Sequence, residues 1–320
     1  MTGERDEAAQ LSAWRESGRI VTMAGRPGGS PDVLIVGGLH GNEPEGLSAG
    51  QRVVNALLER DDALPGRIAL IAGNQGALRE GRRFLDRDLN RRWRRDAVAK
   101  VRTRRLHESS REDREQLDLV ACFEAFLGSA KHGVVLIDLH TTSAGAPPFS
   151  VVIDSSANRT LAASTGLPVI LGFDDYVDAP ILCWFEEMGC LGVGIEGGSG
   201  GDCGTEEHLA AAVWRILSCL GWPSEADSAA PSPGEAAIFR IAHRHSVVPG
   251  SGFKMEPGFR SFQEVIQGQL LASDRGGPIR SMLSGQIFMP LYQSQGSDGF
   301  FLLSKLNEGA GSAHSASVSD

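Results

Sequence analysis

Short apolar runs alternate with helix-like segments over the first 220 residues. Residues 33–39 (VLIVGGL) form a continuous apolar run that ends in glycines, as expected of a strand buried on both faces. Pro44 and Glu45 suit the first turn of a following helix, whose apolar positions recur at helical spacing: Leu47, Val53, Val54, Leu57 and Leu58. Further strands are predicted at 68–72, 134–139, 151–153, 169–171 and 193–195, and a helix at 209–220 with Thr205 as its N-cap. This alternation predicts an α/β fold with a mixed, largely parallel sheet flanked by helices.

The pattern changes after this α/β domain, which we place at residues 1–222. Proline, serine and alanine dominate residues 223–234 (PSEADSAAPSPG), so this segment is predicted to be a linker. Beyond it, short strand-like runs alternate with glycine-rich turns, which is typical of a small β-rich domain over residues 235–304. Residues 305–320 lack anchoring side chains, and we expect a disordered tail there.

Composition excludes several classes of protein. The 320 residues are 41% apolar and 22% charged with a net charge of -9, which is typical of soluble globular proteins and disfavours binding to nucleic acid or anionic membranes. No apolar run approaches the roughly 20 residues that cross a bilayer, and the charged start MTGERDEAAQ differs from a signal peptide, so a cytoplasmic location is expected. Five cysteines without a C-x-x-C pair predict reduced, mostly buried thiols rather than disulfides or a thiolate zinc site.

Basic residues concentrate between Arg79 and Arg105. Twelve basic and four acidic residues give this span a local charge of +8, which leaves -17 for the rest of the chain. A solvated arginine-rich helix over residues 92–116 accounts for its second half. A nucleic-acid patch is disfavoured, because interleaved stacking aromatics are missing. A third interpretation places some of these arginines in a site for an anionic substrate, and charge alone does not choose among the three.

Metal-ligand side chains follow two of the predicted strands. His40 and Glu43 lie in GGLHGNEPEG (37–46), directly after one strand and before a helix. Asp138-Leu139-His140 ends another buried apolar run. Two histidines and one carboxylate are the ligand set of a catalytic zinc with an open position for water. Asp138 would instead point away from the metal, either into the sheet or toward a metal ligand that it contacts without touching the metal itself. Taken alone, H-x-x-E also fits a hydrogen-bonded loop histidine and a helix-capping glutamate.

Glu196 closes a third apolar strand, where a carboxylate is costly unless it is paired or functional. It is a candidate general base that takes a proton from water and delivers it to a leaving amine, with a structural salt bridge to an arginine as the alternative. Residues 197–201 satisfy G-x-S-x-G, the nucleophile-elbow pattern of serine hydrolases. In such an elbow a helix starts almost directly after the serine, whereas here the next helix begins later. A serine hydrolase built on Ser199, with His243 or His245 completing the order Ser…Asp…His, is therefore disfavoured.

These motifs occur together in the order found in one family. The chain carries HGNE at 40–43, GN at 73–74, RFLDRDLNR at 83–91, DLH at 138–140 and GIE at 194–196. Over about residues 31–220 it resembles the aspartoacylase/succinylglutamate desuccinylase family of zinc amidohydrolases, relatives of the zinc carboxypeptidases. The joint occurrence of these motifs is specific, although each of them alone would not be. The resemblance implies a zinc carboxypeptidase-like fold.

The resemblance assigns one Zn²⁺ per chain to three ligands: His40, Glu43 and His140. It makes Glu196 the general base and acid, and it places Arg83 beside the metal to stabilise an oxyanion. Asn90 and Arg91 would bind a carboxylate of the substrate, for which a guanidinium fork is well shaped. The expected activity is hydrolysis of the amide bond of an N-acyl amino acid, or a related small carboxylate, by metal-activated water.

Other activities stay open, namely a carboxypeptidase-like peptidase or an ester hydrolase on the same zinc site, or an inactive binding module. The expected partner is a small molecule that bears a carboxylate, with no nucleic acid and no membrane, while a homo-oligomer is possible. Aspartoacylase has an arginine ten residues before the catalytic glutamate, where this chain has Glu186, and a substrate-binding tyrosine where this chain has Asp298 or a neighbour. A glutamate there would repel a second carboxylate, so we expect the amine portion to be neutral or amino-bearing rather than aspartate.

Overall fold

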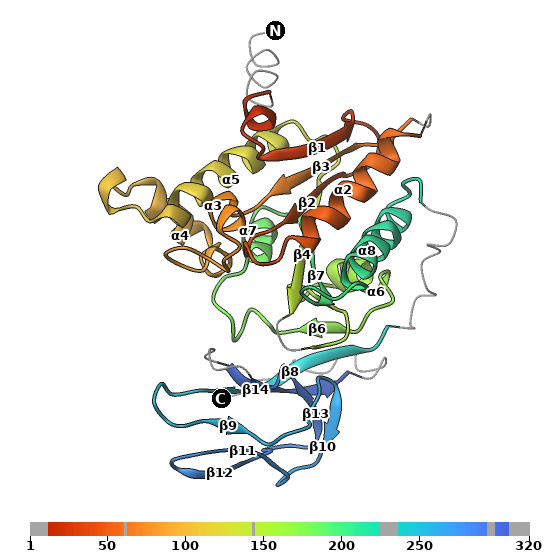
Figure 1. Cartoon of the computed structure of the whole chain (residues 1–320). Helices are drawn as coiled ribbons and strands as arrows, with labels where there is room; N and C mark the ends of the chain where they lie inside the picture. Colours follow the sequence, from red (N-terminus) through yellow and green to blue (C-terminus); the bar gives the residue numbers. More distant parts are fainter. Residues whose placement is uncertain (1–11, 61–62, 143–144, 225–235, 293–297, 307–320) are drawn as a thin grey trace, which may run out of the picture.

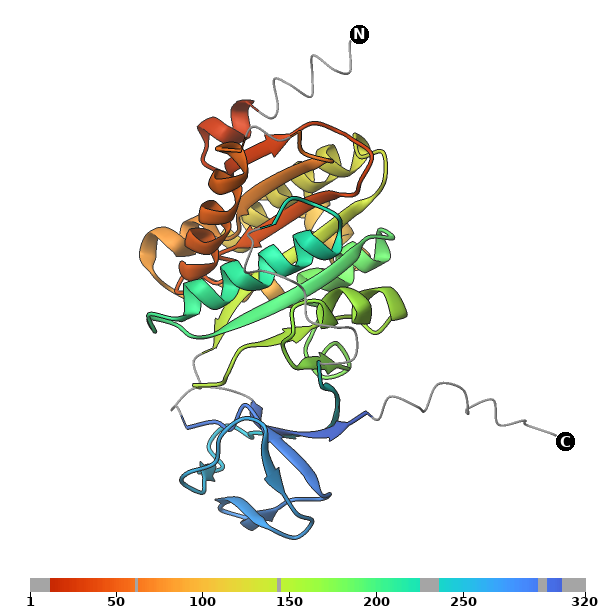
Figure 2. The ribbon, with the colours of Figure 1, turned by 90° about the vertical axis from the view of Figure 1, so that its right-hand side faces the viewer.

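The computed structural model describes residues 12–60, 63–142, 145–224, 236–292 and 298–306 (Figures 1 and 2). Its main sheet has the order β1 (Ile20–Gly25), β3 (Arg67–Ala72), β2 (Asp32–Gly37), β4 (Val134–Thr142), β7 (Leu191–Ser199), β5 (Phe149–Val151), β6 (Val169–Leu171), β8 (Ile238–Ser246), β14 (Asp298–Lys305), β13 (Gly285–Phe288) and β10 (Gln263–Val265). Strands β3, β2, β4 and β7 are mutually parallel, as are β5, β6 and β8. Strand β5 runs antiparallel to β7, and so does β1 to β3. The mixed α/β sheet expected from the sequence is confirmed.

Helices cover both faces of the α/β part of this sheet. One core cluster joins the sheet to α2 (Glu45–Leu58), α6 (Ser156–Ala163) and α8 (Thr205–Cys219). The opposite cluster joins it to α4 (Arg95–Arg102), α5 (Arg111–Gly128) and α7 (Ile181–Glu187). Alternate residues of β2 supply the two clusters, because successive side chains of a strand point to opposite faces. Every residue of β2 and β4 is buried, which explains their continuous apolar runs. None of the described helices is long and apolar enough to cross a membrane.

The C-terminal strands continue the main sheet beyond β6. Strand β8 pairs in parallel with β6, and β14, β13 and β10 follow in antiparallel order. A separate small sheet contains β9 (Lys254–Met255), β11 (Leu270–Asp274) and β12 (Gly277–Arg280). This β-rich region has its own apolar cluster. Most of the expected linker, from position 225 onward, lies outside the described residues, and so does most of the expected tail, from position 307. Lys305, which the sequence placed in the tail, is the last residue of β14. The division into domains therefore stays a prediction.

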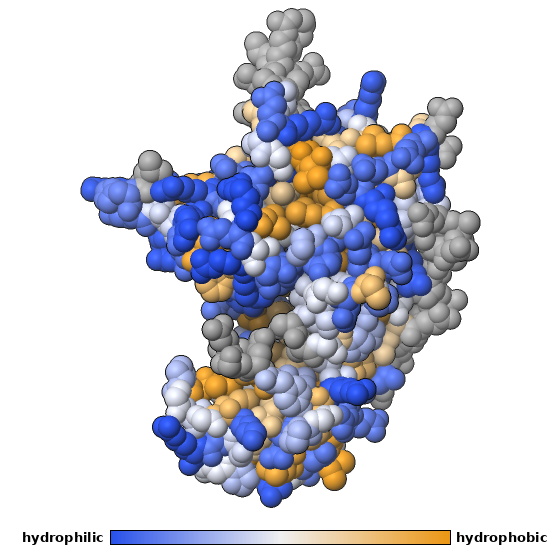
Figure 3. All heavy atoms as spheres, viewed as in Figure 1, coloured by the Kyte–Doolittle hydropathy of each residue, from blue (hydrophilic) through white to orange (hydrophobic). Residues whose placement is uncertain are grey.

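The arginine-rich segment is not one helix, so the expected helix over residues 92–116 is wrong. Helix α4 ends at Arg102, a short 3-10 turn η2 (Leu106–Glu108) follows, and α5 begins at Arg111. Ser110 starts α5 through a capping box: its hydroxyl accepts from the Asp113 N–H at 3.1 Å, and the Asp113 carboxylate accepts from the Ser110 N–H at 2.9 Å. The surface over α4 and α5 is predominantly hydrophilic (Figure 3), and most of α5's apolar residues face the core.

Three smaller expectations also fail. Gly204, rather than Thr205, is the N-cap of α8, and the Thr205 hydroxyl donates to the Ser199 carbonyl at 2.6 Å. The strand expected at 151–153 lies at Phe149–Val151, where it pairs with β6 and β7. The cysteines are free, but only two of the five are buried, so the expectation of mostly buried thiols is wrong. Burial and exposure divide them as follows: Cys122 and Cys183 buried, Cys190 intermediate, Cys203 and Cys219 exposed.

Candidate metal centre

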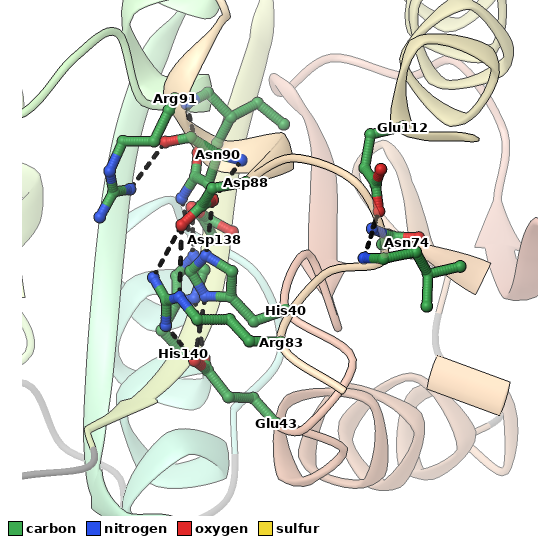
Figure 4. A network of polar contacts seen from close by, with 12 residues as sticks. His40, Glu43, Asn74, Arg83, Asp88, Asn90, Arg91, Glu112, Asp138 and His140 are labelled. Carbon is green, nitrogen blue, oxygen red and sulfur yellow. Dashed lines mark hydrogen bonds and ion pairs between the residues drawn. The ribbon is translucent and has the colours of Figure 1, made fainter. Parts of the chain in front are cut away.

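The three residues expected to bind metal meet at the carboxyl ends of two neighbouring strands. Strands β2 and β4 are parallel, with Gly37 opposite Leu139, so the segments that follow these residues leave the sheet side by side. His40 and Glu43 lie in the turn between β2 and α2, and His140 lies near the end of β4. All three side chains are buried, and their ligand atoms lie within 4.8 Å of one another (Figure 4). Register alone therefore brings together residues that are about a hundred positions apart in the sequence.

Each histidine lies between Glu43 and a second carboxylate. His140 Nδ1 is 3.0 Å from Glu43 Oε2, and its Nε2 is 2.8 Å from Asp138 Oδ2. His40 repeats this arrangement, with Nδ1 3.0 Å from Glu43 Oε1 and Nε2 3.0 Å from Asp88 Oδ1. An Nε2–H that donates to the outer carboxylate leaves the Nδ1 lone pair directed at the cluster, as metal-binding histidines require. Sequence reasoning missed Asp88, although Asp88 lies within RFLDRDLNR (83–91), where it begins the segment DLNR (88–91).

The donor atoms fit a zinc ion. His40 Nδ1 is buried and makes no hydrogen bond within the described residues, although Glu43 Oε1 is 3.0 Å away. The Thr141 N–H donates to Glu43 Oε2 at 3.0 Å and holds the carboxylate in place. Two imidazole nitrogens and a carboxylate are the protein ligands of many catalytic zinc sites, in which water or substrate takes the remaining position. The residues present thus fit a metal ion, and their role as zinc ligands stays a prediction.

Without a metal, the charges of the cluster balance one another. Burial lowers the pKa of His140, but Asp138 and Glu43 outweigh burial and raise this pKa well above its ordinary value. Burial acts in the opposite sense on Glu43, yet the imidazole rings of His140 and His40 beside it bring its pKa well below the usual range. The two shifts thus favour a protonated His140 beside an ionised Glu43. A divalent cation would take the place of that proton.

Glu196 lies beside the cluster on β7. The parallel register of β4 and β7 places it opposite His140. Its Oε2 atom is buried and has no hydrogen-bond partner in the described part of the chain. Burial raises the pKa of Glu196 to about 8, since the repulsion by Glu43 and Asp138 adds to burial while His140 and Arg83 oppose it. An unpaired buried carboxylate with a raised pKa is typical of acid–base chemistry. No ion pair joins Glu196 to an arginine among the described residues, so nothing favours the salt-bridge alternative.

Loop 82–91 brings Arg83 and Asn90 to the same place. Arg83 Nη1 is 3.3 Å from Glu43 Oε1, and its side chain is 42% exposed, so it borders the cluster at the solvent side. Asn90 is 6% exposed, and its Oδ1 accepts from the N–H of Ile181 at 2.7 Å. Its Nδ2 lies 3.2 Å from His140 Nε2. The Asn90 amide oxygen is thus engaged with the protein, and the expected contact of Asn90 with substrate stays a prediction.

Arg91 is directed away from the metal ligands (Figure 4). It donates to the Asn90 carbonyl at 2.8 Å and lines a cavity of about 430 Å³, together with parts of 92–97 and 174–179 and Arg244. Arg244 lies in the same wall but pairs with Asp298 at 2.6 Å. Among the described residues, no carboxylate lies within ion-pair distance of Arg91, so its guanidinium is available to a carboxylate ligand.

Two residues noted as departures from the family have different surroundings. Glu186 is exposed on α7, so its position gives no support to the expected repulsion of a second carboxylate, which stays a prediction. Burial lowers the pKa of Arg91 overall, while Asp88 and, more weakly, Asp298 oppose this effect. Ser199 ends β7, six positions before α8 starts at Thr205, unlike the serine of a nucleophile elbow. His245 is stacked on Phe300, with ring centroids 5.0 Å apart.

Comparison of the sequence with known proteins identifies a family. The family model of the succinylglutamate desuccinylase/aspartoacylase catalytic domain matches residues 29–218. The chain belongs to this family. The resemblance carried by the sequence motifs is therefore confirmed. Members of this family are hydrolases that remove acyl groups.

Individual members of the succinylglutamate desuccinylase/aspartoacylase family match this chain only in part. A succinylglutamate desuccinylase of Serratia proteamaculans is 35% identical over 78 residues, which is 24% of this chain and 24% of that protein. Another, from Pseudomonas paraeruginosa, is 28% identical over 149 residues, or 44% of this chain and 42% of the relative. The matched segments thus span less than half of these curated relatives.

Solved structures share the fold over most of the chain. A succinylglutamate desuccinylase from Vibrio cholerae has a TM-score of 0.69 at 15% identity, covering 88% of this chain and 83% of its own. A product-bound structure of the ectoine utilization protein EutE (DoeB) from Ruegeria pomeroyi has a TM-score of 0.62 at 18% identity, covering 87% and 86%. These neighbours extend the similarity past the catalytic domain into the C-terminal β-rich region.

Proposed function

We propose that this protein is a zinc-dependent deacylase that hydrolyses the amide bond of an N-acyl amino acid or a related small carboxylate. One observation carries the proposal: the donor atoms of His40, Glu43 and His140 lie within 4.8 Å of one another, next to a buried, unpartnered oxygen of Glu196. Membership of a deacylase family supports the same chemistry. Ligands for a Lewis acid and a carboxylate for proton transfer are the two parts that amide hydrolysis needs.

A zinc ion held by these ligands would supply Lewis acidity, lowering the pKa of water and polarising the amide carbonyl. Glu196 accepts the proton of the attacking water and delivers it to the leaving amine, so that water and amide become a carboxylate and an amine. Burial raises the pKa of Glu196, which is typical of a carboxylate that takes part in proton transfer. Arg83, whose Nη1 lies 3.3 Å from Glu43 Oε1, would stabilise the negative charge that the carbonyl oxygen gains.

Arg91 is the proposed anchor for a substrate carboxylate. It has no carboxylate partner within the described residues and opens onto the cavity described above. A guanidinium can bind a carboxylate through two parallel hydrogen bonds, which fixes the orientation of the substrate as well as its charge. The preferred substrate is therefore an acylated amino acid with a free carboxylate, rather than a neutral amide.

The test is to assay the zinc-loaded protein for release of primary amine from N-acyl amino acids, with dipeptides and esters as comparison substrates. Turnover should be highest on N-acyl amino acids. Glu196→Gln should keep the zinc but lose about a hundred- to ten-thousandfold in kcat, because an amide cannot accept the proton of water. Ser199→Ala is the matched control from the same strand and should stay active.

Each other result identifies another function. Preferred cleavage of dipeptides or esters would show the peptidase or esterase. Loss of activity in Ser199→Ala would show a serine hydrolase, and binding of acyl amino acids without any hydrolysis would show a binding module.

A further inference from the structure

A buried carboxylate lies behind the loop that carries much of the site. Glu112, in the first turn of α5, is 2% exposed. Three consecutive backbone N–H groups donate to it: Leu85 to Oε1 at 2.7 Å, and Asp86 and Arg87 to Oε2 at 3.0 and 3.1 Å. The Asn74 side-chain nitrogen lies 3.2 Å from Oε1 as a fourth donor. Figure 4 places Glu112 and Asn74 on the side of the loop away from His40 and Glu43.

These donors form an anion-binding arrangement that the protein fills itself. Successive backbone N–H groups that converge on one point attract a negative charge. The N-terminus of α5 favours a carboxylate at the same position. If the carboxylate is removed, three backbone N–H groups lose their acceptor at once, and they must find water or another anion in its place.

Loop 82–91 pairs with no strand of the described structure, so such contacts position it together with two backbone bonds, Gly41 N–H to the Arg83 carbonyl at 3.3 Å and Arg82 N–H to the Ala77 carbonyl at 3.1 Å. Its inner side carries Arg83 and Asp88, which contact Glu43 and His40. A second contact from α5 is the ion pair of Arg111 with Asp86 at 2.8 Å, but these side chains are 50% and 36% exposed, so water and salt screen the pair. Glu112 thus provides a buried attachment of the loop to the helix.

We infer that Glu112 is a positioning residue: its carboxylate acts as a built-in anion that holds loop 82–91 so that Arg83 and Asp88 lie against the metal cluster. Its kinetic consequence rests on the proposed deacylase function, whereas its structural consequence can be measured without any substrate. Glu112 itself does not touch the reacting atoms.

The variants Glu112→Ala and Glu112→Gln test this role, with Glu115→Gln as the control. Glu115 lies on the same helix and pairs with buried Arg19, but its backbone donor at 2.8 Å is Gly76 of α3 (Gln75–Glu80) and not the loop. Both Glu112 variants should keep stoichiometric zinc and lose about ten- to a hundredfold in kcat, the effect usual for outer contacts of a metal site. Glu115→Gln should lower Tm but keep kcat within about twofold, because it leaves the loop attached.

Two further measurements separate positioning from general stability. In Glu112→Ala, amide hydrogen exchange at residues 85–87 should accelerate, and sodium formate should restore both protection and kcat, whereas sodium chloride at equal ionic strength should not. Glu112→Gln should not respond to formate, since its amide fills the space; if Glu112→Ala does not fold, the kcat and exchange rates of Glu112→Gln decide.

Unchanged exchange in the Glu112 variants, a failure of formate to restore folded Glu112→Ala, or an equal loss of kcat in Glu115→Gln would each overturn the inference. A wild-type protein that hydrolyses no acyl amino acid, but shows the expected exchange and formate effects, would overturn the proposed function and leave the positioning role standing.

Discussion

The three candidate metal ligands stand at the ends of β2 and β4, whereas Arg83, Asp88, Asn90 and Arg91 stand in a loop without a strand partner. On the strand side, position follows from register: Gly37 lies opposite Leu139, and one strand further on His140 lies opposite Glu196. On the loop side, position follows from single side-chain contacts: Glu112 of α5 accepts from backbone N–H groups of the loop, and Asn90 of the loop accepts from the backbone N–H of Ile181 at the start of α7.

This difference predicts two kinds of response to mutation. A residue held by register moves only when the sheet moves, so a substitution there removes a functional group without moving its neighbours. A residue held by a few side-chain contacts shifts when one contact is lost, so effects on the loop side should be graded. Four experiments test this comparison, in order of decreasing effect.

The largest effect is expected for His140→Ala, on the strand side. It removes the Nδ1 ligand and exposes Glu43 and Asp138 to each other's charge, so the protein should lose zinc on dialysis and lose turnover. Elemental analysis and the amine-release assay measure the two losses. His243→Ala, on a strand of the C-terminal region, should retain both. A His140→Ala protein with full zinc and activity would disprove the metal site.

Arg91→Ala, on the loop side, should weaken substrate binding rather than abolish chemistry. A charge-assisted hydrogen bond contributes about 1.5–3 kcal/mol, so KM should rise about ten- to a hundredfold with little change in kcat. Arg94→Ala is the control, because Arg94 lines the same cavity but is 52% exposed and lies 3.7 Å from Glu187. Equal effects of the two substitutions would mean that general charge, and not Arg91, binds the carboxylate.

Zinc binding should release a proton, because the pKa of His140 lies above its ordinary value in the metal-free protein. Zinc affinity should therefore rise with pH, by about tenfold per unit, until the pH passes that pKa. Calorimetry near pH 7 in two buffers of different ionisation enthalpy measures the proton. Asp138→Asn should reduce the release, since it removes the largest charge that raises this pKa. Zinc uptake without proton release in the wild-type protein would contradict the assigned charge state.

The smallest effect is expected for Glu186→Gln. Glu186 is exposed on α7, outside the cavity lining, so the ratio of kcat/KM for N-acetylaspartate and an N-acetyl diamino acid should stay unchanged within error. The carboxylates that do line the cavity are Asp96, Asp174, Asp175 and Asp178. A shift of that ratio toward N-acetylaspartate would bring Glu186 back into substrate selection.

Sequence reasoning located the strand side of the site because its signals are local. An apolar run followed at once by a histidine or glutamate fixes both the strand and the position of the side chain at its end. His40, His140 and Glu196 each follow such a run, and parallel pairing brings them together. The same reasoning placed the mixed sheet, since each buried strand is readable on its own.

The loop side could not be predicted in the same way, because its contacts join distant positions without a periodic pattern. Asp88 reaches His40 across 48 residues, and Glu112 binds Leu85 across 27. For Glu186, alignment with a family position suggested that this side chain repels a second substrate carboxylate, but its exposure on α7 does not support that role. The broken arginine-rich helix had a local signal, the S-x-x-D capping box at Ser110, which the dense charge of that region concealed.

The pairing of β6 with β8 has a consequence for the biosynthesis of the protein. Val169 lies opposite Ile238, so the strand that covers β6 is made almost seventy residues after β6 itself. As the chain leaves the ribosome, the α/β part can fold first, with one side of β6 still unpaired. An open strand edge is a template for pairing with other chains, so aggregation during synthesis should be most acute just before β8 emerges. By covering β6, the C-terminal strands therefore also protect the newly made α/β part from pairing with other nascent copies of the chain on the same polysome.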